Sequence, residues 1–373
     1  MIYQEQYHVA HIFTSQVASI ETFVFNRLLN PYCMRPVPFI TNTLFDLPGC
    51  NNIVDLYSLA NENRLFQRLD AGLQNRLHWS LFFYQALTKI HPQIIHAHFS
   101  GAAEACCWSA RKLSIPLIAN FYGLETKYHV HDPSWLPRYQ RLYREVNSFI
   151  CSSEDMRREM IVSGCPEEKI HVVRCGVDVD LFCGKPKAWC SDEPLCLLSI
   201  ARLHKEKGLN YLVDACHMLN NAGFKNWSLD IIGKGDEESF LQEQILEYEL
   251  EKQVNLVGVL PPASVAEALR NAHIMILPSL KETQGVVLQE AQGTGTPVIT
   301  TSVGGIPEGV IDQETGYIVE PENPKAIFEA IFSFIENPDL LIKMGQRGRQ
   351  LVQSKFTRSI EYDKLASVYE LFT

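Results

Sequence analysis

The feature that most constrains the fold is a succession of short apolar segments separated by longer segments with helical period, which occurs twice along the chain. Gln93–Phe99 and Ile115–Phe121 are such apolar runs in the first half, and Leu195–Ile200 and Ile274–Leu277 lie in the second. Their length and composition predict strands, whereas Leu209–Leu219 repeats its apolar residues as a helix does. Strands that alternate with helices form parallel sheets with right-handed crossovers. The sequence therefore predicts an α/β protein with two doubly wound, Rossmann-like halves.

The remaining segments extend this pattern. Further strands are expected at residues 8–14, 37–41, 53–59, 148–152, 169–174, 227–232, 254–259, 298–301 and 317–319. Further helices are expected at residues 21–29, 63–90, 101–113, 134–146 and 154–163, and most of the chain after residue 324 has helical period.

The alternation is interrupted at Gly184–Pro194, where GKPKAWCSDEP is rich in proline and charge and indicates a linker. We therefore expect a first domain at residues 1–184, a linker at 185–194 and a second domain at 195–356. Two such domains place a cleft between them, which is a favoured location for a ligand.

Composition limits the partners and the compartment. A net charge of −10 argues against nucleic acid. Residues 1–180 carry 16 basic against 17 acidic side chains and residues 181–373 carry 17 against 26, so the first half approaches an anionic surface more easily. The sequence lacks an apolar run that spans a bilayer and a signal-peptide pattern, so we expect a cytoplasmic protein and leave open a peripheral contact with the inner face of the membrane. Eleven cysteines without a C-x-x-C pair indicate reduced thiols and no structural zinc.

A candidate ligand site lies in Lys281–Pro297, which reads KETQGVVLQEAQGTGTP. Gly285 lies between Glu282 and Glu290 and opens a predicted helix that follows a strand. Open α/β sheets bind ligands at such turns, and the free N–H groups of a helix N-terminus suit a phosphate. Carboxylates on both sides of that site would accept hydrogen bonds from hydroxyls. The pattern suits a nucleotide sugar.

Two further turns carry similar chemistry. Arg202 and Lys207 lie where the strand at 195–200 runs into a helix start, and their cations suit a phosphate, although a solvated basic turn is the alternative. Gly233 follows the strand at 227–232 and would let the backbone approach a ligand closely, although G-x-G is common in turns.

Four segments that include these turns resemble, in the same order along the chain, signatures of the GT-B retaining glycosyltransferases of family GT4. The resemblance covers most of residues 90–355 and rests on CSSEDMRREMIVSGCPEEKIHVVRCGVDVDLF, ARLHKEKG, IIGKGDE and LPSLKETQGVVLQEAQGTGTPVITTSVGGIPEGV. Glu282 and Glu290 match the E-x7-E motif of that family. The resemblance implies two Rossmann-like domains that face each other across a cleft, and a last helix, here residues 357–373, that crosses back to the first domain.

The resemblance also implies roles for the candidate residues. Arg202 and Lys207 would bind the diphosphate of the donor and balance its charge as it leaves, and the N–H groups of Gly285–Val287 would meet a phosphate. Glu290 would hold the ribose hydroxyls, and Glu282 would position the sugar through its hydroxyls. The resemblance implies no metal or other cofactor, because cationic side chains and helix dipoles stabilise the charge of the leaving diphosphate.

The implied activity is that of a retaining glycosyltransferase of the polysaccharide-assembly type. It would move a sugar from a UDP- or GDP-sugar to a hydroxyl of a growing glycan, with a lipid-linked acceptor left open. One alternative is a GT-B nucleotide-sugar epimerase, which has a similar cleft. Another alternative is a non-catalytic partner of an assembly complex. The presence of all four charged candidate residues, Arg202, Lys207, Glu282 and Glu290, argues against it.

The first half resembles the family less closely. Its loop Ser19–Phe23 resembles the polysaccharide-assembly subgroup, and His98, at a strand end, is expected near the donor sugar. Where many relatives have a histidine facing that sugar, this chain has Tyr122, whose phenol can donate a hydrogen bond but does not titrate near neutrality. His96 and His98 share one face of a strand, so metal binding is an alternative to the packed or hydrogen-bonded histidines that we favour.

One amphipathic segment is a candidate surface, and a second, apolar segment is expected in the core rather than as a membrane anchor. Ser134–Asn147 places Trp135, Tyr139 and Tyr143 on one stripe with arginines beside it. We favour a helix with a solvated basic edge, and a face for the acceptor or the membrane surface is the alternative. His78–Ile90 is apolar nearly all round and is expected in the core.

Overall fold

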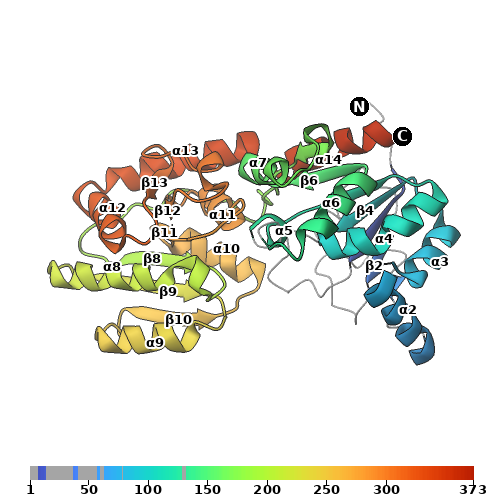
Figure 1. Cartoon of the computed structure of the whole chain (residues 1–373). Helices are drawn as coiled ribbons and strands as arrows, with labels where there is room; N and C mark the ends of the chain where they lie inside the picture. The colour runs from blue at the N-terminus through green and yellow to red at the C-terminus, as the bar shows by residue number, and fades with distance from the viewer. Residues whose placement is uncertain (1–6, 14–36, 41–56, 59–62, 78, 128–131) are drawn as a thin grey trace. The chain divides into compact units, whose positions relative to one another are not determined.

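The computed structural model describes residues 7–13, 37–40, 57–58, 63–77, 79–127 and 132–373. The chain divides into two compact units, Met1–Arg174 with Glu361–Thr373, and Cys175–Ile360. Each unit is a parallel sheet with helices packed on it, so the prediction of two doubly wound halves is confirmed (Figure 1). The expected helix at 21–29 and the loop Ser19–Phe23 lie outside the described residues.

The first unit contains a parallel sheet with the order β3-β2-β1-β4-β5-β6-β7. Its strands are β1 Val9–Phe13, β2 Val37–Ile40, β3 Tyr57–Ser58, β4 Ile94–His98, β5 Leu117–Asn120, β6 Ser148–Cys151 and β7 Ile170–Val172. Its helices are α2 Arg64–Leu77, α3 Leu81–Ile90, α4 Phe99–Leu113, α5 Leu124–Lys127, α6 Leu136–Glu145 and α7 Glu154–Val162, and α14 Arg358–Tyr369 joins this unit from Glu361 onward. Strands β1, β4, β5 and β6 are fully buried, which explains why their sequences are almost continuously apolar.

The prediction of a single long helix at residues 63–90 is wrong, because the structure has two helices, α2 and α3, in this range. The side chain of Ser80 accepts a hydrogen bond from the N–H of Phe83 and so caps α3. The N–H of Ser80 donates to the carbonyl oxygen of Ala105, on α4, over 3.2 Å. The break therefore depends on a contact with a distant helix, which helical period does not reveal.

The second unit contains a parallel sheet with the order β10-β9-β8-β11-β12-β13. Its strands are β8 Leu195–Ile200, β9 Trp227–Ile232, β10 Val254–Gly258, β11 Ile274–Leu277, β12 Val298–Thr301 and β13 Gly316–Val319. Its helices are α8 Leu209–Asn221, α9 Glu238–Glu247, α10 Pro262–Asn271, α11 Val286–Thr294, α12 Pro324–Glu336 and α13 Asp339–Lys355. Residues 185–194, expected as a linker, lie within this unit, and the buried ring of Trp189 packs against Phe224.

None of the helices in the described part of the chain combines the length and the apolar character needed to cross a membrane.

Candidate functional site

The second sheet reverses its order of growth between two neighbouring strands, β8 and β11. From β8 the chain adds β9 and β10 on one side, and it then returns to add β11, β12 and β13 on the other. The crevice beyond the carboxyl ends of two such strands is where open α/β sheets bind ligands. The turns 201–208 and 278–285 follow these strands, and they carry Arg202, Lys207 and Glu282.

Backbone contacts hold these two turns side by side. The N–H of Leu280 donates to the carbonyl oxygen of Glu206 over 2.7 Å. Gly208 has a φ of 61°, and a Cβ there would lie 2.2 Å from the carbonyl oxygen of Pro278. Only glycine permits so close an approach in this conformation. The position of one turn is therefore fixed by the other.

Lys207 and Glu282 meet across these turns. Lys207 Nζ lies 2.6 Å from Glu282 Oε2, and Glu282 Oε1 accepts a hydrogen bond from the N–H of Thr283 over 3.1 Å. The two side chains are 15% and 14% exposed, so the ion pair is largely shielded from water. Arg202, at the start of the same turn as Lys207, is exposed. The structure thus brings one predicted phosphate-binding cation into direct contact with the predicted sugar-binding carboxylate.

The amino end of α11 offers backbone N–H groups that can bind an anion at this site. Gly285 is its N-cap residue with a φ of 73°, a conformation that favours glycine. Val286 and Val287 form the first turn and are partly exposed, and no side chain of the described residues caps this helix end. N–H groups at an uncapped helix start attract anions. The helix start predicted from Gly285 is confirmed.

Glu290 lies on α11, about one turn beyond its first residues. The residue is partly exposed, and desolvation of its carboxyl raises its pKa to about 7, against the opposing effect of the positive charge of Arg358. A carboxyl group that titrates near neutrality, beside a helix N-terminus, is typical of a functional site.

Gly233 contributes close packing of the backbone. It has a φ of 146°, and a Cβ there would lie 1.8 Å from the carbonyl oxygen of Ala201. The N–H of Gly233 donates to the carbonyl oxygen of Gly258 over 2.9 Å. Gly233 therefore joins the carboxyl ends of β8, β9 and β10, and its approach to a ligand stays a prediction.

The first unit carries a separate group of predicted residues, at the carboxyl ends of β4 and β5. His98 Nδ1 lies 2.7 Å from the hydroxyl of Tyr122, and His98 Nε2 lies 2.9 Å from His11 Nδ1. His96 Nδ1 lies 2.7 Å from the hydroxyl of Tyr369. All three histidines are fully buried. His98 and Tyr122, which the sequence singled out separately, are therefore direct partners.

The histidine nitrogens also lie close enough for metal binding to be considered. One ring nitrogen from each of His11, His96 and His98 lies within 4.8 Å of the others. The rings of His96 and His98, however, are stacked, with centroids 4.5 Å apart and an interplanar angle of 14°. An imidazole binds a metal through a lone pair in the ring plane, so two stacked, nearly parallel rings do not direct their lone pairs to one ion. The geometry favours the hydrogen-bonded histidines.

The sequence interpretation missed Glu125, which positions the turn that carries Tyr122. Glu125 is buried, and its carboxylate accepts hydrogen bonds from the N–H groups of Ser100 (2.9 Å), Tyr122 (3.2 Å) and Gly123 (3.3 Å). Burial raises the pKa of Glu125, while these backbone hydrogen bonds act in the opposite direction. The carboxylate thus joins the start of α4 to the turn after β5. An acid three positions after Tyr122 is the signal that could have identified it.

The aromatic stripe of α6 faces the core, and two of the three arginines of this helix have acidic partners. Tyr139 and Tyr143 are buried. Arg138 Nε donates to Glu104 Oε1 over 2.9 Å, and Arg141 Nε lies 2.9 Å from Glu145 Oε1. These carboxylates offset the positive charge of the helix edge, so the arrangement favours the amphipathic helix over a membrane face.

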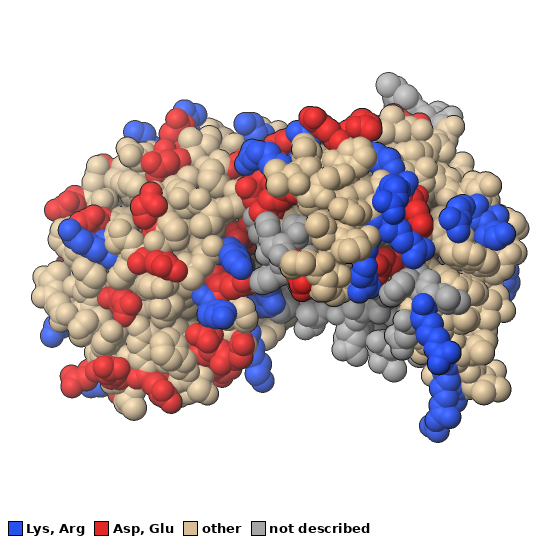
Figure 2. All heavy atoms as spheres, in the orientation of Figure 1, with Lys and Arg blue, Asp and Glu red and all other residues tan. Residues whose placement is uncertain are grey.

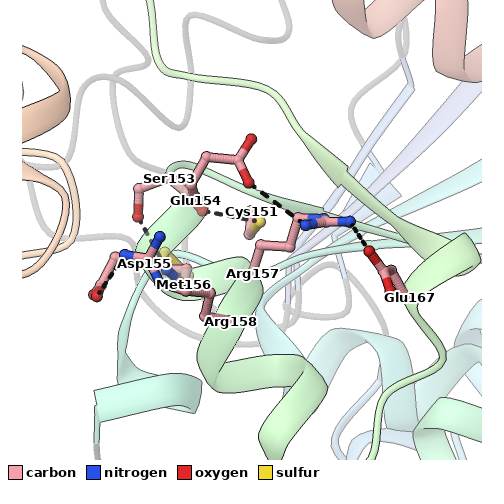
Figure 3. Close-up of polar contacts among 8 residues, drawn as sticks. All are labelled: Cys151, Ser153, Glu154, Asp155, Met156, Arg157, Arg158 and Glu167. Atoms are coloured by element: carbon pink, nitrogen blue, oxygen red, sulfur yellow. Dashed lines mark hydrogen bonds and ion pairs between the residues drawn. The ribbon is translucent and has the colours of Figure 1, made fainter.

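The family-like segment after β6 builds the start of α7 (Figure 3). Ser153 Oγ accepts a hydrogen bond from the N–H of Met156 over 3.2 Å and caps the helix. Arg157 lies between two carboxylates, 3.7 Å from Glu154 and 2.5 Å from Glu167. These contacts hold the start of α7 in place and link the helix to Glu167.

Comparisons with known proteins agree with this architecture. Residues 186–351 match the family described as "Glycosyl transferases group 1", and residues 54–181 match "Glycosyltransferase Family 4". The chain is 30% identical over 297 residues to WcaL of Escherichia coli (strain K12), a glycosyltransferase named for colanic acid biosynthesis, and the match covers 77% of this chain and 72% of WcaL.

A second relative and a solved structure point the same way. The amylovoran biosynthesis glycosyltransferase AmsK of Erwinia amylovora is 28% identical over 284 residues, which cover 74% of this chain and 69% of AmsK. The crystal structure of HepE from Anabaena in complex with UDP and glucose matches with a TM-score of 0.83 at 17% identity, over 98% of this chain and 100% of that one. The likeness to HepE shows the fold, and the relatives bear out the family resemblance.

Proposed function

The chain belongs to the group 1 glycosyltransferases, and from this premise we propose that it transfers a sugar from a nucleotide-diphosphate sugar to a hydroxyl of a growing polysaccharide, with retention of configuration. The names of its relatives WcaL and AmsK, which refer to colanic acid and amylovoran, support a polysaccharide product. The complexes of HepE with UDP and with UDP-glucose support a uridine donor.

One observation carries the proposal for the donor. The Lys207–Glu282 ion pair and the start of α11, which no side chain of the described residues caps, lie at the carboxyl ends of neighbouring strands, where the sheet order reverses. A donor diphosphate at the start of α11 would meet N–H groups at Gly285–Val287 and the cation of Lys207. Arg202 is exposed in the turn after β8 and would add the second cation.

The hydroxyl groups of the donor would meet the two carboxylates. Glu290 would accept hydrogen bonds from the ribose, and Glu282, already oriented by Lys207, would accept them from the sugar. In the first unit, the partly exposed Tyr122 would contact the donor sugar, and the buried His98, 2.7 Å from its hydroxyl, would hold that hydroxyl in place.

The proposed reaction needs no metal. Lys207, Arg202 and the dipole of α11 would stabilise the diphosphate as it leaves. We name no nucleophile from the protein: the acceptor hydroxyl would attack on the face that the diphosphate leaves, and a phosphate oxygen of the donor would take its proton. A chelator should therefore leave the rate of transfer unchanged.

The first experiment is a thermal-shift screen of the purified chain with UDP, GDP and ADP and with their sugars. A ligand that binds the folded state raises the melting temperature, so one base should stand out. Arg202→Ala and Glu290→Gln should abolish that shift, whereas Lys325→Ala, which changes an exposed cation on α12, should keep it. A chain that binds none of these nucleotides would contradict the proposal.

The second experiment separates transfer from epimerisation. The selected nucleotide sugar is incubated without acceptor and followed by NMR. Slow hydrolysis that releases the sugar in its original anomeric configuration supports a retaining transferase. An epimerised nucleotide sugar would instead identify an isomerase.

A further inference from the structure

In the described part of the second unit, helix α13 borders a cavity of about 520 Å³ whose lining shares no residue with the candidate site. One face of the helix, with residues at i, i+4, i+7, i+8 and i+11, supplies Ile342, Gln346, Arg349, Gln350 and Gln353. The segment before β8 supplies Lys185 and Pro186. The volume lies within the range of small-molecule sites, about 300–1,000 Å³.

Two glycines bring the walls of this cavity together. A Cβ at Gly345, on α13, would lie 2.1 Å from the carbonyl oxygen of Gly295 and 3.0 Å from Pro186 Cβ. Gly295 ends α11 with a φ of 88°, and a Cβ there would lie 2.7 Å from the backbone nitrogen of Pro186. The segment that carries Lys185 is therefore packed against both α13 and the end of α11.

The polar side chains of the cavity are available to a ligand. Those of Lys185, Arg349 and the three glutamines have no hydrogen-bond or ion-pair partner among the described residues, and no acidic residue lines the cavity. Arg347 offers the contrast on the same helix, because it lies outside the cavity and 4.0 Å from Glu314. The cavity thus presents two cations without acidic partners and three unpaired amides.

The charge of the cavity is opposite to that of the unit around it. Residues 181–373 carry 17 basic against 26 acidic side chains. Figure 2 shows acidic side chains at many places on the drawn face of the second unit, the one that contains β8 to β13 in Figure 1. Helix α13, however, has four basic residues and a single acid, Asp339, in its first turn. A local cluster of cations in an acidic unit favours an anionic ligand.

We propose that this cavity binds a sugar phosphate, as a second ligand site that does not depend on the proposed transfer reaction. The guanidinium group of Arg349 and the ammonium group of Lys185 suit a phosphate. The glutamine amides both donate and accept hydrogen bonds, as sugar hydroxyls require. Ile342 and Pro186 add apolar contacts for the C–H groups of a sugar ring.

The test is calorimetric titration of the full chain with glucose 1-phosphate. Glucose and inorganic phosphate should each bind at least about tenfold more weakly, because each lacks half of the recognised groups. Lys185→Gln with Arg349→Gln should weaken binding of glucose 1-phosphate about tenfold or more. The matched control, Lys343→Gln with Arg347→Gln, removes the same charge from residues of α13 outside the cavity and should bind as the unchanged protein does.

Several outcomes would overturn the inference. These are no binding of glucose 1-phosphate, equally tight binding of glucose or inorganic phosphate, or equal losses in the two double variants. Binding that Arg202→Ala abolishes would place the sugar phosphate in the donor site instead. Tighter binding of glucuronate than of glucose 1-phosphate would assign the cavity to an acidic sugar of a polysaccharide.

The nucleotide-dependent thermal shift separates this inference from the proposed function. It should be the same in Lys185→Gln with Arg349→Gln as in the unchanged protein, which also shows that the variant folds. A chain that binds glucose 1-phosphate in the cavity but no nucleotide would contradict the proposed function alone. A chain that binds a nucleotide but no sugar phosphate would contradict this inference alone.

Discussion

Lys207 and Glu282 form an ion pair of 2.6 Å that links the turn after β8 to the turn after β11. The sequence suggested a different part of the donor for each residue, and the structure shows that they are also partners of each other. Because both side chains are largely buried, each charge depends on the other for compensation. The pair therefore has a structural role as well as its proposed role in donor binding.

Removing one member of this pair should destabilise the second unit. We expect Lys207→Met and Glu282→Gln each to lower the free energy of unfolding by about 2–4 kcal/mol, because each leaves a shielded charge without its partner. The double variant should cost less than the two single changes together. Urea denaturation followed by tryptophan fluorescence measures this.

The exposed pair Lys325–Glu329 on α12 provides the control. Its side chains are 72% and 59% exposed, so breaking it should change stability by no more than about 0.5 kcal/mol. If the effects of Lys207→Met and Glu282→Gln add without coupling, the pair does not contribute as the geometry indicates.

Glu290 should make stability depend on pH. Desolvation of its carboxyl raises its pKa to about 7, so the folded chain binds this proton more tightly than the unfolded chain does. Its contribution to stability is then present at low pH and is lost as the pH rises through 7. Glu290→Gln should be more stable than the unchanged protein at pH 8, by about 1–3 kcal/mol, and the difference should shrink toward pH 5. Thermal unfolding across this range tests it, and a difference that does not vary with pH would contradict it.

Donor binding should have the opposite pH dependence at the same residue. If ribose hydroxyls donate to the Glu290 carboxylate, its ionised form accepts these hydrogen bonds more strongly than its protonated form does. The affinity of the unchanged protein for a nucleotide sugar should then rise between pH 6 and pH 8 by up to about tenfold. Glu290→Gln should bind weakly and without this dependence. Calorimetric titration measures the affinity, and a flat profile for the unchanged protein would remove Glu290 from the proposed site.

Two glycines with positive φ should respond differently to alanine. Gly223 has a φ of 88° and open space around an added Cβ, so Gly223→Ala should cost only the conformational strain, about 1 kcal/mol. At Gly233 an added Cβ would lie 1.8 Å from a backbone oxygen, so Gly233→Ala must displace the turns after β8 and β9. We expect a loss of at least about 3 kcal/mol and of nucleotide binding. Equal melting temperatures for the two variants would contradict this.

The central strands of the second unit, β8 and β11, were predictable because buried parallel strands are nearly continuous in their apolar residues. The bounds of β8, β9, β11 and β12 match the sequence prediction. The start of α11 was also predictable, because Gly285 is a local signal for a left-handed N-cap residue. These features depend on residues close together in the chain.

The contacts between distant turns were not predictable from one sequence. The ion pair of Lys207 with Glu282 joins residues 75 positions apart, and the break between α2 and α3 depends on a contact with α4. Glu125 escaped notice because its role depends on three N–H groups, one at the start of α4 and two in the turn after β5. Sequence patterns identify which residue types lie at strand ends, whereas their pairing depends on how the sheet orders those strands.

Tyr122 provides the last prediction, because the family resemblance led us to expect a histidine at this position. Its hydroxyl lies 2.7 Å from His98 Nδ1, so Tyr122→Phe removes one hydrogen bond of a buried histidine and should cost about 1–2 kcal/mol. If Tyr122 contacts the donor sugar, Tyr122→Phe should also slow transfer while nucleotide affinity is unchanged. Tyr122→His should make transfer depend on pH between 6 and 8, because imidazole titrates in this range and a phenol does not. Transfer rates of Tyr122→Phe and the unchanged protein that agree at every pH would show that the hydroxyl takes no part in the reaction.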